Sequence, residues 1–499
     1  MTAQSPSPPA GPLSAVPLPA SDPAALGVDA GGVHAFLDAL EAAPRIAPHS
    51  LMIVRHGRVV TAGWWAPYAP GRLHLLYSLS KSFTSTAAGL AVADGLLRLD
   101  DTVVSYFPEF DADITDPGSR AMLVRHVASM ASGHLTETVH RASDLDPGNL
   151  VRGFLLLPPD RAPGTVFAYN QPTTYTLGSI VQRLTGETLT EYLRPRILDP
   201  LGVGETAWLQ SPAGRDLAYS GMYATTDAIA RLGLLHLNGG RWNGEQLLPA
   251  SWVAEATRAH VANDDGTPGS AASDWRQGYG FQFWMSRHGY RGDGAYGQFC
   301  LVLPEYDAVI AMTAETEEMQ KVLDLAWEHL LPAFGPDPLP DRAARDEALR
   351  ERLSRLALPP LAAKPAPPAD PAAWSGAEFA PRGGVCAAQK SLTGVTVAAD
   401  GAGWLLSLAE DGTRLELRFD GTAWAVEDGP DAPVPTALSA GWTDADTLVA
   451  DVLFVETPHH LVVTCSLTDR TFTARWSSTP LHPGRLRSYR APRVRAGSG

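Results

Sequence analysis

The hydrophobic pattern of the chain changes near Trp374, and this change limits the folds that are possible. After this point apolar residues alternate with polar ones, as at Leu415, Leu417 and Phe419, and a period of two is typical of half-buried β-strands. Asp-Gly pairs, which favour tight hairpin turns, recur at positions 400–401, 411–412 and 420–421. Short strands separated by such turns indicate an antiparallel barrel or sandwich. We therefore expect residues 374–495 to form a C-terminal antiparallel β-barrel domain.

The preceding part of the chain mixes helical and strand-like segments. The segment "DAGGVHAFLDALEAA" predicts a helix, and "LMIVRHGRVVTAGWW" predicts a β-hairpin that turns at His56-Gly57. Proline-rich breaks then surround the charged helix "DRAARDEALRERLSRLAL", a composition typical of a spacer. We expect a disordered Pro/Ala-rich tail over 1–28, a mixed α and β domain over 29–335, and a linker containing the charged helix over 336–373.

Composition excludes several classes of function. A net charge of −15 without a basic stripe argues against a nucleic-acid partner. The three cysteines are scattered and form no CxxC pair, which fits a reducing compartment and argues against a structural zinc site. The sequence has no apolar run of membrane-spanning length and no signal-peptide pattern, so we expect a cytoplasmic protein without a membrane partner. HExxH, Walker and GxGxxG motifs are absent, and we expect neither a metal nor another cofactor.

Ser78 and Lys81 form an SxxK motif at the start of a segment with helical character. Residues three apart share one face of a helix, so the Ser78 hydroxyl and the Lys81 amine are expected to project side by side. The helix dipole would favour the anion that forms when a serine at the amino end is acylated. Lys81 can act as a base only when it is neutral, and its apolar neighbours Leu76, Leu79 and Phe83 make burial, and hence a lowered pKa, the expected cause.

Several motifs around Ser78 resemble the serine β-lactamase and penicillin-binding-protein family, in particular its class C and esterase-like branch. The likeness begins with "YSLSKSFTSTAAGLAVADGLLRLDDTVVSYFPEF" and continues through "LVRHVASMASGH". It extends to "PGTVFAYNQPTTYTLGSIVQRLTGETLTEYLRPRILDPLGV" and covers roughly residues 30–334. The resemblance implies an α+β fold in which helices flank an antiparallel sheet, here followed by a barrel of lipocalin-like type.

The resemblance also implies roles for individual residues. Ser78 matches the acylated nucleophile, Lys81 the lysine that moves its proton, and Tyr169 the tyrosine that passes the proton to the leaving group. A cationic lysine beside Tyr169 would make the phenol easier to ionise. The family has an asparagine two residues after this tyrosine, whereas this chain has Gln171 there and Asn170 one position earlier. Either residue is therefore a candidate for the substrate-binding amide.

The third motif of the family, Lys-Thr-Gly, is absent. Arg291-Gly292-Asp293 stands roughly in its place, with a register that is open by two residues. Arg291 could hold a substrate carboxylate with two hydrogen bonds, or it could pair with Asp293 across a turn. By the same resemblance, the backbone N–H groups of Ser78 and of a residue near Gly294 would form the oxyanion hole.

These features favour a serine hydrolase that acts through an acyl-enzyme on a small-molecule ester or amide. An acyltransferase or peptide cyclase of the same fold, and a β-lactamase or D-amino-acid peptidase, are alternatives. A binding protein that has lost activity is a further alternative, because the second and third motifs are altered. The sequence leaves the acyl group, the acceptor and the oligomeric state open.

Overall fold

The computed structural model describes residues 16–361, 371–429 and 432–493. Part of the expected N-terminal tail, part of the proline-rich linker and the last residues of the expected barrel domain lie outside these described residues. Within them the chain forms two compact units. The larger unit contains residues 16–63, 76–354 and 492–493, and the smaller unit contains residues 64–75 and the described part of 355–491.

A six-stranded antiparallel sheet forms the centre of the larger unit, with the strand order β2-β1-β11-β10-β9-β8. The predicted hairpin is confirmed as β1 and β2, and its turn has His56 and Gly57 at positive φ. All eight residues of β11 are buried, since helices cover the sheet. The strands are β1 (Ala47–Arg55), β2 (Arg58–Trp64), β8 (Trp284–Met285), β9 (Tyr290–Gly294), β10 (Gln298–Leu303) and β11 (Ala308–Glu315).

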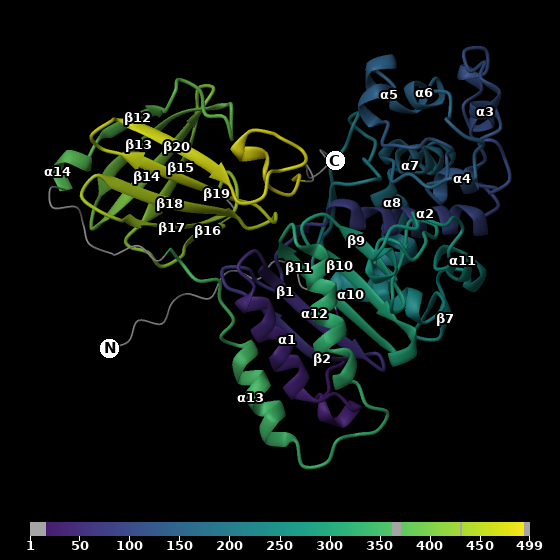
Figure 1. Cartoon of the computed structure of the whole chain (residues 1–499), viewed down its shortest axis with the longest axis horizontal. Helices are drawn as coiled ribbons and strands as arrows, with labels where there is room; N and C mark the ends of the chain where they lie inside the picture. Colours follow the sequence, from purple (N-terminus) through teal and green to yellow (C-terminus); the bar gives the residue numbers. More distant parts are fainter. Residues whose placement is uncertain (1–15, 362–370, 430–431, 494–499) are drawn as a thin grey trace. The chain divides into compact units, whose positions relative to one another are not determined.

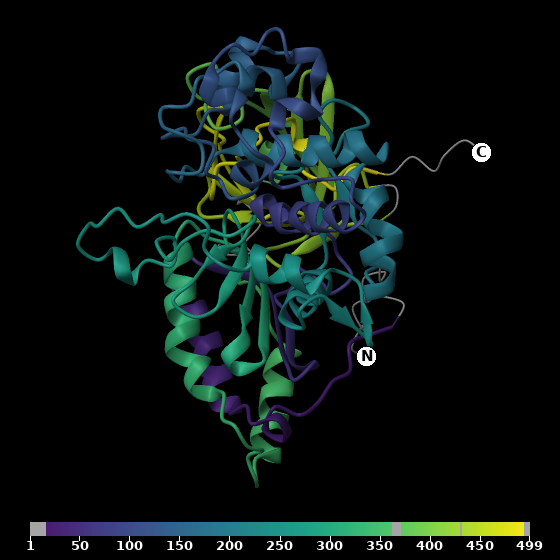
Figure 2. The same cartoon turned by 90° about the vertical axis from the view of Figure 1, so that its right-hand side faces the viewer.

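Helices pack against this sheet and gather at one end of it. Helix α1 (Ala30–Ala42) confirms the predicted helix, contacts β1 and lies beside α12 (Met319–His329), as Figure 1 shows. Helix α10 (Thr226–Leu237) packs against β10 and β11. Figures 1 and 2 both show the blue helices from α2 to α8 at one end of the sheet. These and the remaining elements of the unit are α2 (Ser80–Ala93), α3 (Pro117–Arg120), α4 (Val124–Ala128), α5 (Val139–Leu145), α6 (Leu150–Leu155), α7 (Gln171–Thr185), α8 (Leu189–Leu193), α9 (Asp199–Leu201), β4 (Ala207–Trp208), β5 (Met222–Ala224), β6 (Arg241–Trp242), β7 (Glu245–Gln246), α11 (Ala250–Ala256) and α13 (Ala343–Leu353).

The smaller unit contains a nine-stranded sheet that curls into a nearly closed barrel, drawn in green and yellow in Figure 1. Its strand order is β15-β14-β13-β12-β20-β19-β18-β17-β16, and β12 and β20 pair in parallel. The Asp-Gly pair at 411–412 turns between β14 and β15 with both residues at positive φ, as predicted. The elements are α14 (Pro371–Trp374), β12 (Ala377–Pro381), β13 (Leu392–Asp400), β14 (Gly403–Glu410), β15 (Thr413–Phe419), β16 (Ala425–Glu427), β17 (Thr436–Trp442), β18 (Thr447–Phe454), β19 (His460–Ser466) and β20 (Thr471–Trp476).

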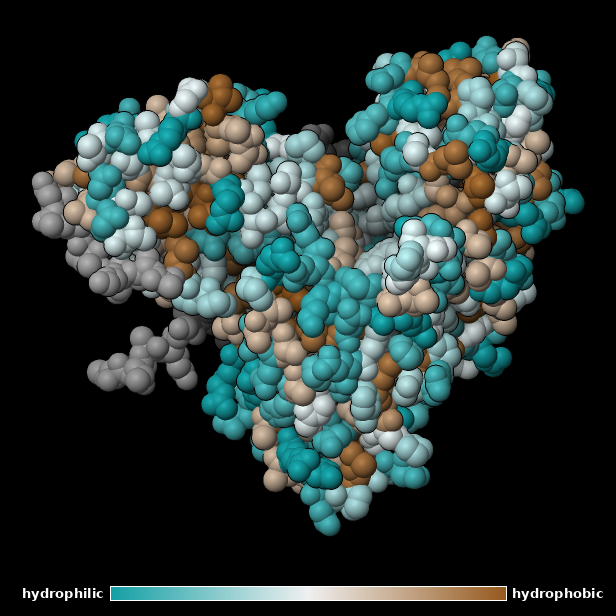
Figure 3. All heavy atoms as spheres, viewed as in Figure 1, coloured by the Kyte–Doolittle hydropathy of each residue, from teal (hydrophilic) through white to brown (hydrophobic). Residues whose placement is uncertain are grey.

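Alternation of apolar and polar residues explains the core of this barrel. Leu415, Leu417 and Phe419 are buried, and the intervening residues of β15 are exposed. Aromatic rings fill the interior, with Trp374 and Trp404 both against Trp442. On the outside, the face in Figure 3 carries small separate apolar groups among hydrophilic residues. Burial inside each unit therefore accounts for most of the apolar side chains.

A short segment from the first part of the chain belongs to the barrel unit. Trp65 is fully buried, and the Tyr68 hydroxyl donates to Thr457 O at 3.3 Å. Strand β3 (His74–Leu75) follows, and Leu75 N donates to Glu456 O at 2.8 Å. The segment ends three residues before Ser78.

Candidate active site

Ser78 lies on a strained turn immediately before helix α2. The residue is half-buried in a 3₁₀ turn over Tyr77–Leu79, and α2 begins at Ser80. Tyr77 has a φ of 48°, a backbone region that non-glycine residues seldom occupy and that functional sites retain at a cost. The Ser80 hydroxyl fixes this turn because it donates to Tyr77 O at 2.6 Å and accepts from Met222 N at 3.0 Å. The sequence thus forms the predicted helix with Ser78 at its amino end.

Lys81 lies beside Ser78, as the SxxK spacing predicted. Its Nζ is 3.0 Å from Ser78 Oγ, 2.7 Å from Gln171 Oε1 and 2.7 Å from the backbone oxygen of Tyr219. The side chain is only 1% exposed. Burial lowers the Lys81 pKa to about 7, although the negative charges of Glu137 and Asp293 act in the opposite direction.

The three partners of Lys81 suit a neutral amine. Gln171 Oε1 and Tyr219 O can only accept hydrogen bonds, so each takes one of the two N–H groups of an uncharged amine. The third partner, the Ser78 hydroxyl, can accept from the ammonium form or donate to the lone pair of the neutral form. The geometry therefore allows Lys81 to receive the Ser78 proton without any rearrangement.

Tyr169 completes the group of residues around Ser78. Its hydroxyl forms a hydrogen bond with the Ser78 side chain, and its ring stacks on Trp284 with centroids 5.1 Å apart. Lys81 Nζ lies 4.8 Å from the centre of the Tyr169 ring. The expectation that Tyr169 ionises easily is wrong, because burial raises the pKa of Tyr169 above its ordinary value and outweighs the opposing effect of the hydrogen bond. Burial therefore favours the protonated phenol over the phenolate.

Of the two amides next to Tyr169, the one that reaches Lys81 is Gln171. Gln171 is the first residue of α7 and is half-buried. Asn170 is fully buried, and its Oδ1 accepts from the backbone N and the hydroxyl of Thr138 at 3.0 and 2.9 Å. Asn170 thus holds the loop before α5, whereas Gln171 contacts the lysine.

Strand β9 runs directly against the Ser78 turn. A Cβ atom on Gly294 would lie 2.1 Å from Leu76 O, and one on Gly292 would lie 2.3 Å from Leu79 Cδ1. Only residues without a side chain allow this close approach. The backbone near Gly294, expected to contribute to an oxyanion hole, therefore lies beside the turn that carries Ser78.

Arg291 has the environment of a structural residue. Its Nε donates to Asp293 Oδ2 at 2.8 Å, and its Nη1 donates to Asp274 O at 2.9 Å and Ser286 Oγ at 2.7 Å. The side chain is fully buried and lies over the ring of Trp275, 4.5 Å from its centre. This is the alternative in which Arg291 pairs with Asp293, and it leaves the guanidinium no exposed edge for a substrate carboxylate.

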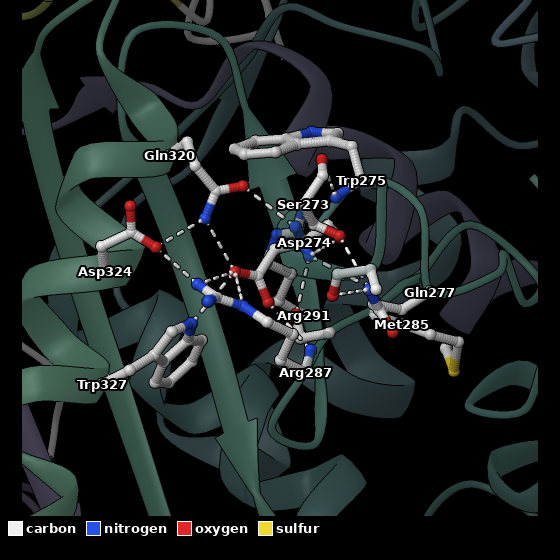
Figure 4. Close-up of polar contacts among 12 residues, drawn as sticks. Ser273, Asp274, Trp275, Gln277, Met285, Arg287, Arg291, Gln320, Asp324 and Trp327 are labelled. Carbon is white, nitrogen blue, oxygen red and sulfur yellow. Dashed lines mark hydrogen bonds and ion pairs between the residues drawn. The ribbon is translucent and has the colours of Figure 1, made fainter. Parts of the chain in front are cut away.

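Asp274 fixes the loop around Arg291, and no feature of the sequence identified it. Figure 4 shows the side chains of Arg287, Gln320 and Trp327 directed at its carboxylate. They donate at 2.8 to 3.0 Å, Arg287 through two nitrogens. Burial raises the pKa of Asp274, but these hydrogen bonds outweigh it and hold the pKa below its ordinary value. The ionised carboxylate thereby holds the segment that contains Trp275.

Comparison with known proteins identifies the family of this chain. A family model described as "Beta-lactamase" matches residues 33–333, which is more than half of the chain. The chain belongs to the beta-lactamase family. It is therefore an enzyme of a serine hydrolase family, and the resemblance stated from the motifs is confirmed.

Relatives within the beta-lactamase family include several hydrolases. The chain is 27% identical over 279 residues to the 6-aminohexanoate-dimer hydrolase of Paenarthrobacter ureafaciens, an alignment that covers 52% of this chain and 71% of the relative. It is 30% identical over 171 residues to the lovastatin esterase of Penicillium rubens, covering 30% and 43%. A solved Bacillus anthracis structure assigned as a 6-aminohexanoate-dimer hydrolase has a TM-score of 0.51 at 21% identity, covering 66% of this chain and 91% of that one. This structural similarity supports the predicted fold and nothing about the activity.

Two residues that the sequence did not indicate also lie at the site of this beta-lactamase-family chain. Tyr219 contributes its backbone oxygen to Lys81 and follows Ala218, which has a φ of 63°. Glu137 accepts hydrogen bonds from Gln171 N at 3.0 and 3.2 Å. A strained backbone and a contact across 34 positions are invisible in a linear pattern, although Glu137 does follow the Ser-Gly turn that resembles the family.

Two kinds of feature are absent from the described residues, a metal-binding cluster and a membrane-spanning helix. No group of three or more His, Cys, Asp or Glu side chains is arranged to hold a metal ion in the part of the chain that the structure describes. Within residues 16–361, 371–429 and 432–493, none of the helices has both the length and the apolar character needed to cross a membrane.

Proposed function

We propose that the chain hydrolyses an ester or amide of a small metabolite through an acyl-enzyme on Ser78. Lys81 in its neutral form, which burial favours, takes the Ser78 proton as the hydroxyl attacks the carbonyl carbon. The phenol of Tyr169 donates a proton to the leaving oxygen or nitrogen and recovers one from Lys81. Water then attacks the acyl-enzyme by the reverse sequence of proton transfers. The three contacts of Lys81 carry this proposal, because they hold Nζ 3.0 Å from Ser78 Oγ, where the neutral amine can take the hydroxyl proton.

The surroundings of Arg291 support an esterase or amidase over an enzyme for anionic substrates. A β-lactam or a peptide terminus presents a carboxylate, which requires an accessible cation. Arg291 is fully buried and bonded to Asp293. We therefore expect neutral or cationic substrates to be turned over faster than anionic ones.

A chromogenic short-chain ester tests the proposal. We expect turnover by the natural chain and loss of turnover in Ser78→Ala and Lys81→Ala, since the first lacks the nucleophile and the second lacks the base. Lys321→Ala, which removes an exposed lysine of α12, is the matched control and should retain full activity. Equal rates in all four proteins would show that the observed hydrolysis does not use Ser78, and no turnover in any of them would favour a binding protein.

A further inference from the structure

Glu137 is an exposed carboxylate one hydrogen bond away from the residue that holds Lys81. Its two oxygens accept from Gln171 N at 3.2 and 3.0 Å, and Oε1 also accepts from the backbone N of Thr138 and Val139 at 2.8 and 2.9 Å. These bonds fix the carboxylate beside the first turn of α7. The side chain nevertheless remains exposed to solvent, so a substrate can meet it.

Among the described residues, the hydrogen bonds that Glu137 accepts come from backbone N–H groups and not from a cationic side chain. The charges of Glu137, Asp293 and Arg291 act electrostatically on the pKa of Lys81, of Tyr169 or of both. Arg291 and Asp293 form a buried ion pair, so their fields largely cancel at a distance. Above its pKa of about 7 Lys81 is neutral and adds no charge. The amino end of α7 offsets part of the Glu137 charge, and a negative potential remains.

The rings beside Lys81 also suit a positive charge. Tyr169 and Tyr219 are both half-buried, with Lys81 Nζ 4.8 and 5.7 Å from their centres. The faces of aromatic rings attract cations, including quaternary ammonium groups. The net charge of −15 over the whole chain further favours the approach of cations over anions.

We propose that Glu137 makes the site selective for esters or amides that carry a positively charged amino or quaternary ammonium group. This inference rests on the proposed function and names the substrate class of the same site. Glu137 pairs with the ammonium group while Ser78 attacks the carbonyl carbon, and no bond to Glu137 forms or breaks.

Two pairs of esters test this selectivity. The two esters of a pair have the same shape, and one of them carries a permanent positive charge. The first pair is butyrylcholine and the ester in which carbon replaces the ammonium nitrogen, which puts the charge on the alcohol. The second pair is the p-nitrophenyl ester of trimethylammonio-butyrate and that of its carbon isostere, which puts the charge on the acyl group. We expect kcat/KM to favour the cation by about tenfold in at least one pair. This preference should shrink when the ionic strength rises from about 10 mM to about 500 mM.

Variants of Glu137 separate selectivity from a structural role. Glu137→Gln should bring the cation-to-neutral ratio close to one, and Glu137→Asp should restore part of the ratio. Because Glu137 also accepts hydrogen bonds from Gln171 N, the readout is this ratio and not the rate of either ester alone. Glu245→Gln removes an exposed glutamate of β7 and should leave the ratio unchanged. An unchanged cation-to-neutral ratio in Glu137→Gln, or a natural chain that prefers the neutral ester in both pairs, would overturn the inference. Failure to hydrolyse any of the four esters would instead overturn the proposed function.

Discussion

The replacement Gln171→Glu tests whether Lys81 is the base. In the natural chain Lys81 has a pKa of about 7, and its base form is the neutral one. Activity should therefore be lost as the pH falls through about 7 and reach a plateau above about 8.5, with a tenfold fall in kcat/KM for each unit on the acid side. The replacement puts a carboxylate in the place of an amide oxygen that lies 2.7 Å from Lys81 Nζ.

The size of the effect follows from this distance. An opposite charge so close favours the protonated amine and raises its pKa by about 1 to 3 units. At pH 7 the neutral fraction of Lys81 falls from about one half to between about 9% and 0.1%, so kcat/KM falls by about 5-fold to 500-fold. The same variant should regain activity at higher pH, because the amine still loses its proton there.

The assay is kcat/KM for a neutral ester from pH 5 to pH 10 at constant ionic strength. Gln171→Leu is the control, because it removes the same amide oxygen without adding a charge and should not shift the profile to higher pH. A natural profile that stays flat through pH 7, or a Gln171→Glu profile that coincides with it, would refute the assignment of Lys81 as the base.

Three further changes test other parts of the site. Tyr169→Phe removes the proton donor and should lower kcat by about 10²-fold to 10⁴-fold with little change in Tm, which thermal unfolding will check. Gly294→Ala introduces a Cβ atom that would lie 2.1 Å from Leu76 O. The variant should therefore displace the turn that carries Ser78 and lower kcat/KM by about 100-fold. Gly421→Ala is the control: its added atom meets nothing within 4 Å, so it should change neither the rate nor the Tm. Ending the chain after Ser354 removes most of the unit to which residues 64–75, just before Ser78, belong. We expect this truncated protein to lose both activity and cooperative unfolding, and full kcat/KM in the truncated chain would contradict that expectation.

Local sequence patterns predicted the elements whose contacts are local. The SxxK spacing brought Ser78 and Lys81 together because residues three apart share a helix face. The alternation in β15 and the Asp-Gly turn at 411–412 predicted a strand and its hairpin for the same reason. Burial of Lys81, and with it the lowered pKa, followed from the apolar residues that surround it in sequence.

Features that depend on distant residues were not predictable from these patterns. Gln171, and not Asn170, contacts Lys81, because the Asn170 amide oxygen accepts a hydrogen bond from Thr138, which lies 32 positions away in the sequence. The ionisation of Tyr169 was expected to be easier because only its charged neighbour was considered, whereas burial among the other aromatic rings has the larger effect. Nothing in the sequence indicates that Trp65 is buried in the barrel unit, since that packing joins residues hundreds of positions apart.

The most direct test of the account is to trap the acyl-enzyme. The protein is mixed with a slowly released p-nitrophenyl ester, quenched in acid within the first turnover, and examined by intact-protein and peptide mass spectrometry. We expect one acyl group per chain, on the peptide that contains Ser78, and no acyl group on Ser78→Ala. Acylation of another residue, or turnover by Ser78→Ala at the natural rate, would contradict the claim that Ser78 is the nucleophile.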